Sequence, residues 1–297
     1  MESKKMTSFK TAGVVGLGNM GRGMALSLTR AGFNVVGFDS SAGATAAAVE
    51  AGIAVTASMA ELGQHCDAIV LSLPNSAIVK SVLFGDDTKG GLAAAIRAGA
   101  VLIDTTTADP KSTRNNAPAL AERGIKFIDA PVSGGAAGAL KGELTMFIGG
   151  NAADVELATP LLAALGTKRF YIGEVGAGHT AKLINNLMVA SHLLVASEAF
   201  HLSEAAGVPI AQIIEAINAG SGRSGVTQYN YPSRIMNDAF NSGFTMQLMR
   251  KDVNLAIELM NQVGVDLPVV REVGTRWKNS ADTLADGEDF NRITQLH

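Results

Sequence analysis

The pattern of hydrophobic positions changes once along the chain. From Thr11 to about Gly173, short apolar runs alternate with Ala- and Leu-rich helical stretches such as 42–51 and 110–123. The runs are rich in Val, Ile and Leu without strict alternation, which is typical of strands covered on both faces by helices. The predicted strands are Ala12–Gly16, Val35–Phe38, Ala68–Leu73, Val101–Asp104, Lys126–Ile128, Thr145–Ile148 and Arg169–Ile172. Strands that alternate with helices predict a doubly wound α/β sheet.

After Gly176 helical periodicity dominates to the end of the chain. The stretch 179–206 predicts one helix of about 40 Å at 1.5 Å per residue. It ends at Gly207, and Pro209 begins the next helix. The further predicted helices are Ile210–Ala219, Thr227–Met236, Gln247–Val263 and Pro268–Leu284. We therefore expect an α/β domain over residues 1–175 and an all-helical domain over residues 176–297, joined by the long helix.

Composition narrows the class of protein. The 297 residues are 47% hydrophobic and 17% charged, which suffices for a sizeable core. The net charge of −3 gives no reason to expect a nucleic acid or an anionic membrane as partner. The single cysteine, Cys66, excludes an intrachain disulfide and is expected to be a buried thiol. Because Met1–Lys10 is polar and short, and no apolar run has the length of a membrane span, we expect a cytoplasmic protein.

A glycine-rich motif lies between the first predicted strand and the first helical stretch. Gly16, Gly18 and Gly21 form a G-x-G-x-x-G pattern, which carries weight here because of its position between strand and helix. Gly16 permits a tight turn, Gly18 lets a pyrophosphate approach the backbone, and Gly21 lets the helix pack closely on the strand. The pyrophosphate then lies on free amides at the positive end of a helix. The motif predicts a Rossmann domain whose cofactor-binding turn comprises Gly16, Leu17, Gly18, Asn19, Met20 and Gly21.

Asp39 ends the second predicted strand, about 20 residues beyond the glycines. Its carboxylate is expected to accept hydrogen bonds from the adenosine ribose and to repel a 2′-phosphate. Ser40 and Ser41 follow, so no arginine stands beside Asp39 to hold such a phosphate. The expected cofactor is therefore NAD rather than NADP. The alternative is a glycine-rich turn between core strands without a cofactor.

Loops that follow strands at their carboxyl ends are candidates for ligand binding. Leu73, Pro74 and Asn75 follow one strand, and a run of threonines that ends with Thr107 follows another. Their amides and hydroxyls suit ribose or nicotinamide, although ordinary turns use the same residue types.

The next strand leads into a small-residue loop that contains Ser133, Gly134 and Gly135. A hydroxyl and backbone amides exposed together form a nest suited to a substrate carboxylate. The alternative is a flexible loop.

Lys182 and Asn186 lie four residues apart on the first turns of the long predicted helix, so they share a face. A lysine near a helix N-terminus opposes the macrodipole, which lowers its pKa toward the range of a general acid/base. Spacing alone does not distinguish this role from that of a solvated surface lysine. His179 is expected to cap the helix end, with a direct role as the alternative, and Arg250–Asp252 is expected to form a solvated helix face.

The remaining histidines show no spacing typical of metal ligands, so we expect no metal. They are His65, His192, His201 and His297.

Taken in order, these motifs resemble the β-hydroxyacid dehydrogenase family, and within it the 3-hydroxyisobutyrate dehydrogenases. The likeness extends from Gly13 to about Gly287. Its quoted parts are G-L-G-x-M-G-x-x-M at 16–24, D-A-P-V-S-G-G at 129–135 with G-x-L-T at 142–145, G-x-G-x-x-x-K-x-x-x-N at 176–186, and the K-D pair at 251–252.

The resemblance implies roles for individual residues. Lys182 would be the catalytic acid/base, and Ser133, Gly134 and Gly135 would receive the substrate carboxylate. Asn186 would orient the reacting oxygen, while Thr107 and Lys251 would contact the cofactor. The implied reaction oxidises a short 3-hydroxy acid to its semialdehyde with NAD, or the reverse. The N-terminal domain would bind NAD, and the helical domain would serve substrate binding and assembly into a homodimer or homotetramer.

Other substrates and functions stay open. Tartronate semialdehyde reductases, threonate dehydrogenases and short-chain semialdehyde reductases share every quoted motif. A decarboxylating 6-phosphogluconate dehydrogenase would carry a histidine before the asparagine, where this chain has Asn185-Asn186, and a longer C-terminal part. A non-catalytic dinucleotide-binding scaffold of this family would lack Lys182.

Overall fold

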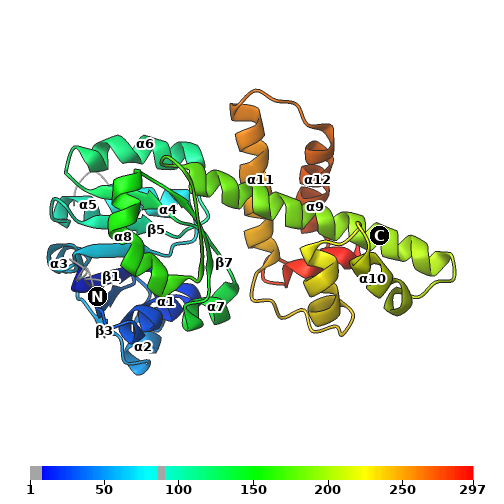
Figure 1. The fold of residues 1–297 in the computed structure, drawn as a ribbon, viewed down its shortest axis with the longest axis horizontal. Helices are drawn as coiled ribbons and strands as arrows, with labels where there is room; N and C mark the ends of the chain where they lie inside the picture. Colours follow the sequence, from blue (N-terminus) through cyan, green and yellow to red (C-terminus); the bar gives the residue numbers. More distant parts are fainter. Residues whose placement is uncertain (1–8, 86–90, 297) are drawn as a thin grey trace, which may run out of the picture. The chain divides into compact units, whose positions relative to one another are not determined.

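The computed structural model describes residues 9–85 and 91–296 (Figure 1). The first eight residues of the N-terminal segment and His297 lie outside the described residues. Contacts divide the chain into two compact units, Met1–Lys182 and Leu183–His297. Each unit is described by itself.

The first unit is built on one mixed sheet with the strand order β3-β2-β1-β4-β5-β6-β8-β7, and β9 pairs with β8. The strands are β1 (Thr11–Val15), β2 (Asn34–Phe38), β3 (Ala54–Val55), β4 (Ala68–Leu71), β5 (Val101–Asp104), β6 (Lys126–Asp129), β7 (Val132–Ser133), β8 (Thr145–Gly149) and β9 (Lys168–Gly173). The pairs from β3 through β6 are parallel, whereas β8 runs antiparallel to β6. The chain order reverses between β1 and β4, which is the switch point where a doubly wound sheet binds its ligand.

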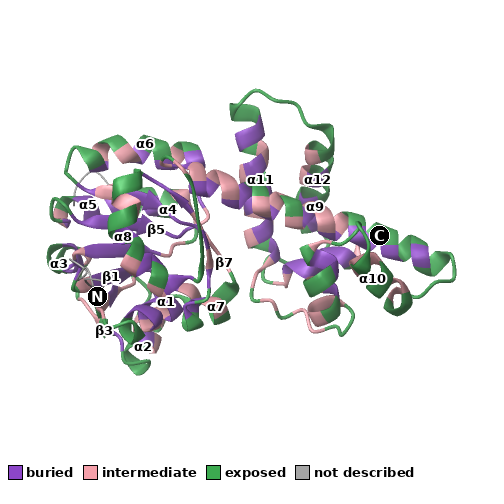
Figure 2. Cartoon of the chain, in the orientation of Figure 1, coloured by how far each residue is buried: buried purple, intermediate pink, exposed green. Residues whose placement is uncertain are grey.

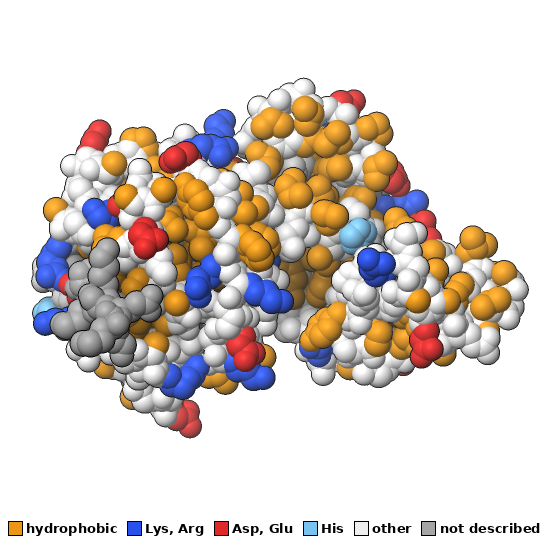
Figure 3. All heavy atoms as spheres, in the orientation of Figure 1, with side chains coloured by type: hydrophobic (Ala, Val, Ile, Leu, Met, Phe, Trp, Pro, Cys, Tyr) orange, Lys and Arg blue, Asp and Glu red, His pale blue; other side chains and the backbone are white. Residues whose placement is uncertain are grey.

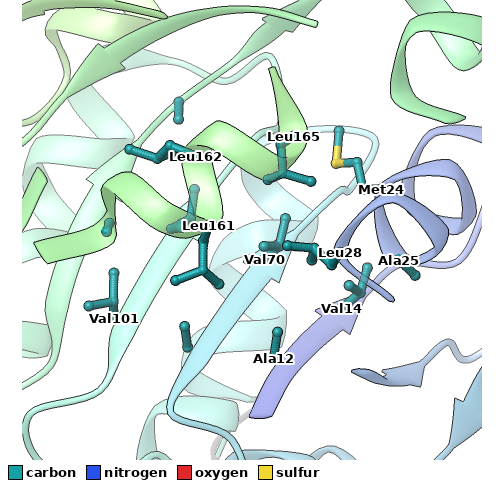
Figure 4. Close-up of a cluster of buried hydrophobic side chains, with 14 of the residues drawn as sticks. Ala12, Val14, Met24, Ala25, Leu28, Val70, Val101, Leu161, Leu162 and Leu165 are labelled. Atoms are coloured by element: carbon teal, nitrogen blue, oxygen red, sulfur yellow. The ribbon is translucent and has the colours of Figure 1, made fainter. Parts of the chain in front are cut away.

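Helices cover both faces of this sheet. They are α1 (Asn19–Arg30), α2 (Ala42–Glu50), α3 (Met59–His65), α4 (Ser76–Phe84), α5 (Leu92–Ala95), α6 (Pro110–Ala121), α7 (Gly135–Lys141) and α8 (Ala152–Leu165). Because side chains alternate along each strand, one set of strand residues packs under α1 and α8. Figure 4 shows this cluster, in which Val14 and Val70 meet Leu28 and Leu161. The residues of opposite parity, such as Val15 and Ile69, pack under α3 and α4.

Polar side chains set the starts of several helices. Ser41, Ser58, Asn75 and Asn151 each accept a hydrogen bond from an amide in the first turn of the helix that follows. At α6, Asp109 caps the helix and Pro110 occupies its first position. The helix α1 differs, because its cap is Gly18 and no side chain bonds its first amides.

The second unit is helical. After α9 (Ala177–Ala205), which begins in the first unit, come α10 (Ile210–Ala219), a π-helix (Val226–Ile235), α11 (Met246–Gln262), α12 (Pro268–Asn279) and the 3₁₀ turns Ser280–Asp282 and Phe290–Gln295. The core of the second unit surrounds Trp277, whose indole N–H donates to the Ala190 carbonyl oxygen at 3.2 Å. The rings of Phe200 and Tyr231 pack edge to face with centroids 4.6 Å apart.

The long helix α9 corrects one expectation from the sequence. An 18-residue window of this 29-residue helix has a mean hydropathy of 1.3, so by length and composition it could cross a membrane. Leu183, Ala190, Leu193 and Phe200 are nevertheless buried in hydrophobic clusters of the second unit. Figure 2 shows buried, intermediate and exposed positions alternating along α9. We interpret α9 as the core helix of a globular unit.

Most predicted elements lie within a few residues of their observed positions, and the predicted fold class is confirmed. The sequence missed β3 and β7, which are only two residues each. The predicted helix 227–236 is a π-helix, and the predicted helix 268–284 ends at Asn279. The expectation that Cys66 is a buried thiol is confirmed.

Candidate active site at the carboxyl edge of the sheet

The glycine-rich turn joins β1 to α1. Gly16 has φ +91°, and a Cβ there would lie 2.2 Å from the Ser72 carbonyl oxygen. A Cβ at Gly21 would lie 1.8 Å from the Gly16 carbonyl oxygen. A Cβ at Gly18, in contrast, would meet nothing within 4 Å. Gly16 and Gly21 are therefore required by the turn itself, whereas Gly18 faces open space through which a ligand can reach the backbone.

The first amides of α1 fit an anion. The first helical hydrogen bond runs from the Arg22 amide to the Gly18 carbonyl oxygen at 2.9 Å, so the amides of Asn19, Met20 and Gly21 precede it. Gly18 and Asn19 are exposed, and no side chain caps the helix. Amides at the positive end of a helix form a ready anion site, so this turn fits a pyrophosphate.

Asp39 lies directly beside that turn. Its carboxylate accepts hydrogen bonds from the Leu17 amide at 2.6 Å and from the Ser41 amide at 2.7 Å. Each oxygen keeps a further acceptor position, and the residue is partly exposed. The arrangement brings a negative charge to the place where the adenosine ribose of a dinucleotide follows the pyrophosphate.

The loops after β4 and β5 are joined to each other. The Leu73 amide donates to Thr106 Oγ1 at 3.2 Å, and Thr105 Oγ1 donates to the Leu71 carbonyl oxygen at 2.6 Å. Asn75 uses its side chain to cap α4 through the Ile78 amide. Pro74 is exposed and Thr107 is half-buried at the same edge of the sheet.

The loop that contains Ser133 leaves the sheet at β7. Gly134 and Gly135 have φ values of +131° and +63°, and both are exposed. The first helical bond of α7 runs from the Gly138 amide to the Gly134 carbonyl oxygen, so the amides of 135–137 precede it. The helix α7 packs on α1 so closely that a Cβ at Gly23 would lie 2.8 Å from the Leu140 amide nitrogen. The structure thus places the Ser133 loop beside the helix that carries the glycine-rich turn.

The start of α9 is anchored to the same edge. The carboxylate of Asp129, the last residue of β6, accepts hydrogen bonds from the Gly176 amide at 2.7 Å and the His179 amide at 2.8 Å. The His179 side chain does not cap the helix end as expected. It is fully buried, with Nδ1 2.8 Å from Thr113 Oγ1 and Nε2 2.9 Å from the Thr106 carbonyl oxygen. Lys182 follows three residues later and is buried.

Asp104 ends β5 directly beside Asp129 in the sheet register. Its Oδ1 accepts the Thr106 amide at 3.0 Å, while its Oδ2 is buried without a hydrogen bond and lies 4.0 Å from His179 Nε2. Burial raises the pKa of Asp104 above its ordinary value, and the neighbouring Asp129 raises it further. The sheet therefore holds two carboxyl groups and an imidazole in one buried cluster.

The second unit holds Asn186 and Lys251 in one connected group. Asn186 Nδ2 donates to Asp252 Oδ2 at 2.6 Å, and Lys251 Nζ lies 2.9 Å from Asp252 Oδ1. Asn185 Nδ2 donates to Asn186 Oδ1 at 3.0 Å. The prediction of a solvated face at 250–252 is wrong for Asp252, which is fully buried. The amide hydrogen bond to Oδ2 and the ammonium charge beside Oδ1 offset the cost of burying this carboxylate.

Sequence reasoning missed the buried cluster of Asp104, Asp129 and His179. A signal was present, because Asp104 and Asp129 both end neighbouring parallel strands. Sequence reasoning also placed no weight on Asp252. Among the described residues, no group of three or more His, Cys, Asp or Glu side chains could hold a metal ion.

Comparison with known proteins agrees with this geometry. Residues 11–173 match the family described as "NAD binding domain of 6-phosphogluconate dehydrogenase". Residues 176–297 match the family described as "NAD-binding of NADP-dependent 3-hydroxyisobutyrate dehydrogenase". The chain belongs to the β-hydroxyacid dehydrogenase family. It is therefore an oxidoreductase that acts on a CH–OH donor with NAD or NADP.

Two relatives and one solved structure illustrate the range of this family. The 2-(hydroxymethyl)glutarate dehydrogenase of Eubacterium barkeri is 36% identical over 86% of this chain and 84% of its own. The NAD-dependent L-serine dehydrogenase of Pseudomonas aeruginosa is 36% identical over 84% of this chain and 85% of its own. The structure of Mycobacterium tuberculosis 3-hydroxyisobutyrate dehydrogenase with L-serine has a TM-score of 0.88 at 29% identity and covers 96% of this chain and 98% of its own.

Proposed function

We propose that this β-hydroxyacid dehydrogenase uses NAD to interconvert a short 3-hydroxy acid, similar to 3-hydroxyisobutyrate, and its semialdehyde. One observation carries the proposal: in the first unit, the dinucleotide turn and the start of the Lys182 helix occupy the same edge of the sheet. A dehydrogenase needs these two parts together, since one binds the cofactor and the other moves the proton.

Preference for NAD is supported by Asp39. A 2′-phosphate would lie against its carboxylate, which is already fixed in place by the Leu17 and Ser41 amides. When bound, the nicotinamide would accept or supply the hydride. Residues 16–21 would hold the pyrophosphate, and residues 73–75, Thr107 and Lys251 would contact the rest of the cofactor.

The substrate carboxylate would bind at Ser133, Gly134 and Gly135. The positive φ values of Gly134 and Gly135 and the amides of 135–137, which precede the first helical hydrogen bond of α7, support this role, because such a turn presents several N–H donors to one anion. The names of the relatives above share a chemical feature, a hydroxyl group on the third carbon of an acid. Threonate, tartronate semialdehyde and other short-chain semialdehydes are the alternative substrates.

Lys182 would act as the acid/base. It would take the hydroxyl proton during oxidation and return it during reduction, while Asn186, one helical turn further along α9, would orient the reacting oxygen. The hydrogen bonds of Asn186 to Asp252 and Asn185 support this role, because they fix the orientation of its amide.

The two domains would then have different functions. Residues 1–175 would form the NAD-binding Rossmann domain, and residues 176–297 would form a helical domain for substrate binding and assembly. We further propose a homodimer or homotetramer in the cytoplasm.

A panel of substrates tests the proposal. Purified protein is mixed with NADH or NADPH and a series of semialdehydes, and in the reverse direction with 3-hydroxyisobutyrate, L-serine or L-threonate. We expect turnover of at least one short 3-hydroxy acid pair, faster with the NAD form. A non-catalytic scaffold would bind NADH and turn over none of them.

A further inference from the structure

Three buried polar side chains from three different elements converge where α9 begins. Asp104 ends β5, Asp129 ends β6, and His179 lies in the first turn of α9. Their side chains are at most 1% exposed. The ring of His179 lies between the two carboxyl groups, with Nδ1 3.8 Å from Asp129 Oδ2 and Nε2 4.0 Å from Asp104 Oδ2.

Asp129 fixes the backbone of α9 at its start. Its two oxygens accept the Gly176 and His179 amides, which gives the helix a carboxylate cap from a strand 47 residues away in sequence. The surroundings of the Asp129 carboxylate are tightly packed. A Cβ at Gly149 would lie 2.6 Å from Asp129 Oδ1, and a Cβ at Gly178 would lie 2.3 Å from the Phe147 carbonyl oxygen.

His179 fixes the rotation of the same turn. Nε2 donates to the Thr106 carbonyl oxygen, which requires a proton on that nitrogen, and Nδ1 pairs with the Thr113 hydroxyl on α6. Thr106 in turn accepts the Leu73 amide, so the imidazole connects α9 to the loops after β4 and β5. The two backbone amides and the ring therefore oppose both a shift of α9 along its axis and a rotation about it.

We propose that Asp129 and His179 are positioning residues that hold α9 so that the Lys182 amine stands at the reacting oxygen. The inference rests on the proposed role of Lys182. Lys182 lies three residues beyond His179, which is less than one helical turn. Any tilt or shift of α9 at its contacts with Asp129 and His179 therefore moves the Lys182 side chain. A misplacement of about 1 Å in a proton-transferring group costs on the order of 10²-fold in rate.

The test compares Asp129→Asn with a matched control, Asp67→Asn. Asp67 also accepts two backbone amides, those of Lys10 and Thr11, but it lies at the opposite, amino edge of the sheet. In Asp129→Asn one amide loses its acceptor and faces an NH₂ group instead. We expect the single-turnover rate of hydride transfer to fall about 10- to 100-fold, with the Kd for NADH and the substrate KM unchanged. Asp67→Asn should keep the rate of the wild type.

A second pair of variants covers the case in which Asp129→Asn fails to fold. His179→Gln keeps an N–H donor near the Thr106 carbonyl oxygen, whereas His179→Leu removes it. We expect His179→Gln to retain several-fold more turnover than His179→Leu. Equal rates in the two variants would overturn the positioning role of His179.

Lys182→Ala separates failure of this inference from failure of the proposed function. In that background Asp129→Asn should cost no further turnover, because the group that it positions is gone. Two independent losses that multiply would overturn the positioning role. A Lys182→Ala enzyme with full activity would instead overturn the proposed function, and with it the positioning of an acid/base.

Amide hydrogen exchange at Gly176 and His179 gives a readout that does not depend on activity. We expect both amides to exchange faster in Asp129→Asn than in the wild type. Unchanged exchange rates would contradict the role of Asp129 in holding the start of α9.

Discussion

In the proposed function, Asp39 links the fold to the choice of cofactor. The Leu17 and Ser41 amides hold its carboxylate beside the glycine-rich turn, where the adenosine ribose of the cofactor would lie. Exchange of the carboxylate for a neutral group should therefore change selectivity more than stability.

We predict that the protein prefers NAD over NADP by at least about tenfold in kcat/KM, or about 1.4 kcal/mol. Asp39→Asn and Asp39→Ser should narrow this preference, because neither repels a 2′-phosphate. Steady-state kinetics with both cofactors measures the effect. Equal efficiency of the wild type with NAD and NADP would show that Asp39 does not govern the choice.

The raised pKa of Asp104 predicts how the stability of the protein changes with pH. Its pKa is raised by burial, so the folded state holds the proton more tightly than the unfolded chain does. Its contribution to stability is fully present below the ordinary pKa of about 4 and is lost as the pH rises through the raised value. Relative to the wild type, Asp104→Asn should become more stable as the pH rises, which urea denaturation across that range would measure.

For Asp67→Asn we predict the opposite change of stability with pH. Desolvation alone would raise the pKa of Asp67, but hydrogen bonds from Thr11, Lys10 and Arg97 outweigh it and lower the pKa. Stability from Asp67 is therefore present above its ordinary pKa and lost as the pH falls. Asp67→Asn should become less stable than the wild type as the pH rises. Parallel curves for the two variants would contradict at least one of the two pKa directions.

Single residues also mark the limit of prediction from sequence. The three motif glycines were assigned their functions from spacing alone, and the structure gives Gly16 and Gly21 contacts that no other residue could make. Asp252 and His179 were misjudged because burial is decided by neighbours distant in sequence. Asp252 pairs with Asn186, 66 residues away, and His179 contacts Thr106, 73 residues away.

At the scale of elements, length decided which predictions held. The longer strands and helices contain enough hydrophobic positions to show a repeat. The strands β3 and β7 have two residues each and are too short to show one. The antiparallel direction of β8 was not predictable from its own residues, since direction depends on the connection through β7 and α7. The segment 226–235 was predicted as an α-helix, because the i→i+5 hydrogen bonds of a π-helix leave no distinct pattern in ten residues of sequence.

The turn between β7 and α7 yields a prediction about substrate binding. Ser133→Ala removes a hydroxyl from the proposed carboxylate nest but leaves the amides of 135–137, so the substrate KM should rise about tenfold with little change in kcat. Ser81→Ala, on the exposed face of α4, serves as the control. A loss confined to kcat would contradict a role for Ser133 in binding the substrate carboxylate.

At the scale of the whole molecule, the second unit exposes large apolar side chains. On α9 they include Met188, Val195 and Leu202, of which Leu202 is 70% exposed. Hydrophobic side chains also gather over α11 and α12 in Figure 3. Val265, which follows α11, and Val269 of α12 are both exposed. Exposed apolar positions in such numbers suit burial against another subunit.

We predict a homodimer or homotetramer by light scattering at micromolar concentration. Leu202→Glu should shift the mass toward the monomer, because a charge would be buried in the interface. The control, Val49→Glu, places the same charge at an exposed apolar position on α2 of the first unit and should leave the mass unchanged. A wild-type protein with the mass of a monomer would refute the prediction.

The proposed reaction depends on Lys182 as the proton carrier, so exchange of this lysine is the decisive experiment. With the best substrate of the panel, Lys182→Ala should lose about 10²–10⁴-fold in turnover while its affinity for NADH stays near that of the wild type. Lys182→Arg should not restore activity, because a guanidinium group does not release a proton near neutral pH. If Lys182→Ala instead keeps more than about half of the wild-type turnover, Lys182 is not the proton carrier, because loss of a proton-transferring group lowers turnover far more than that.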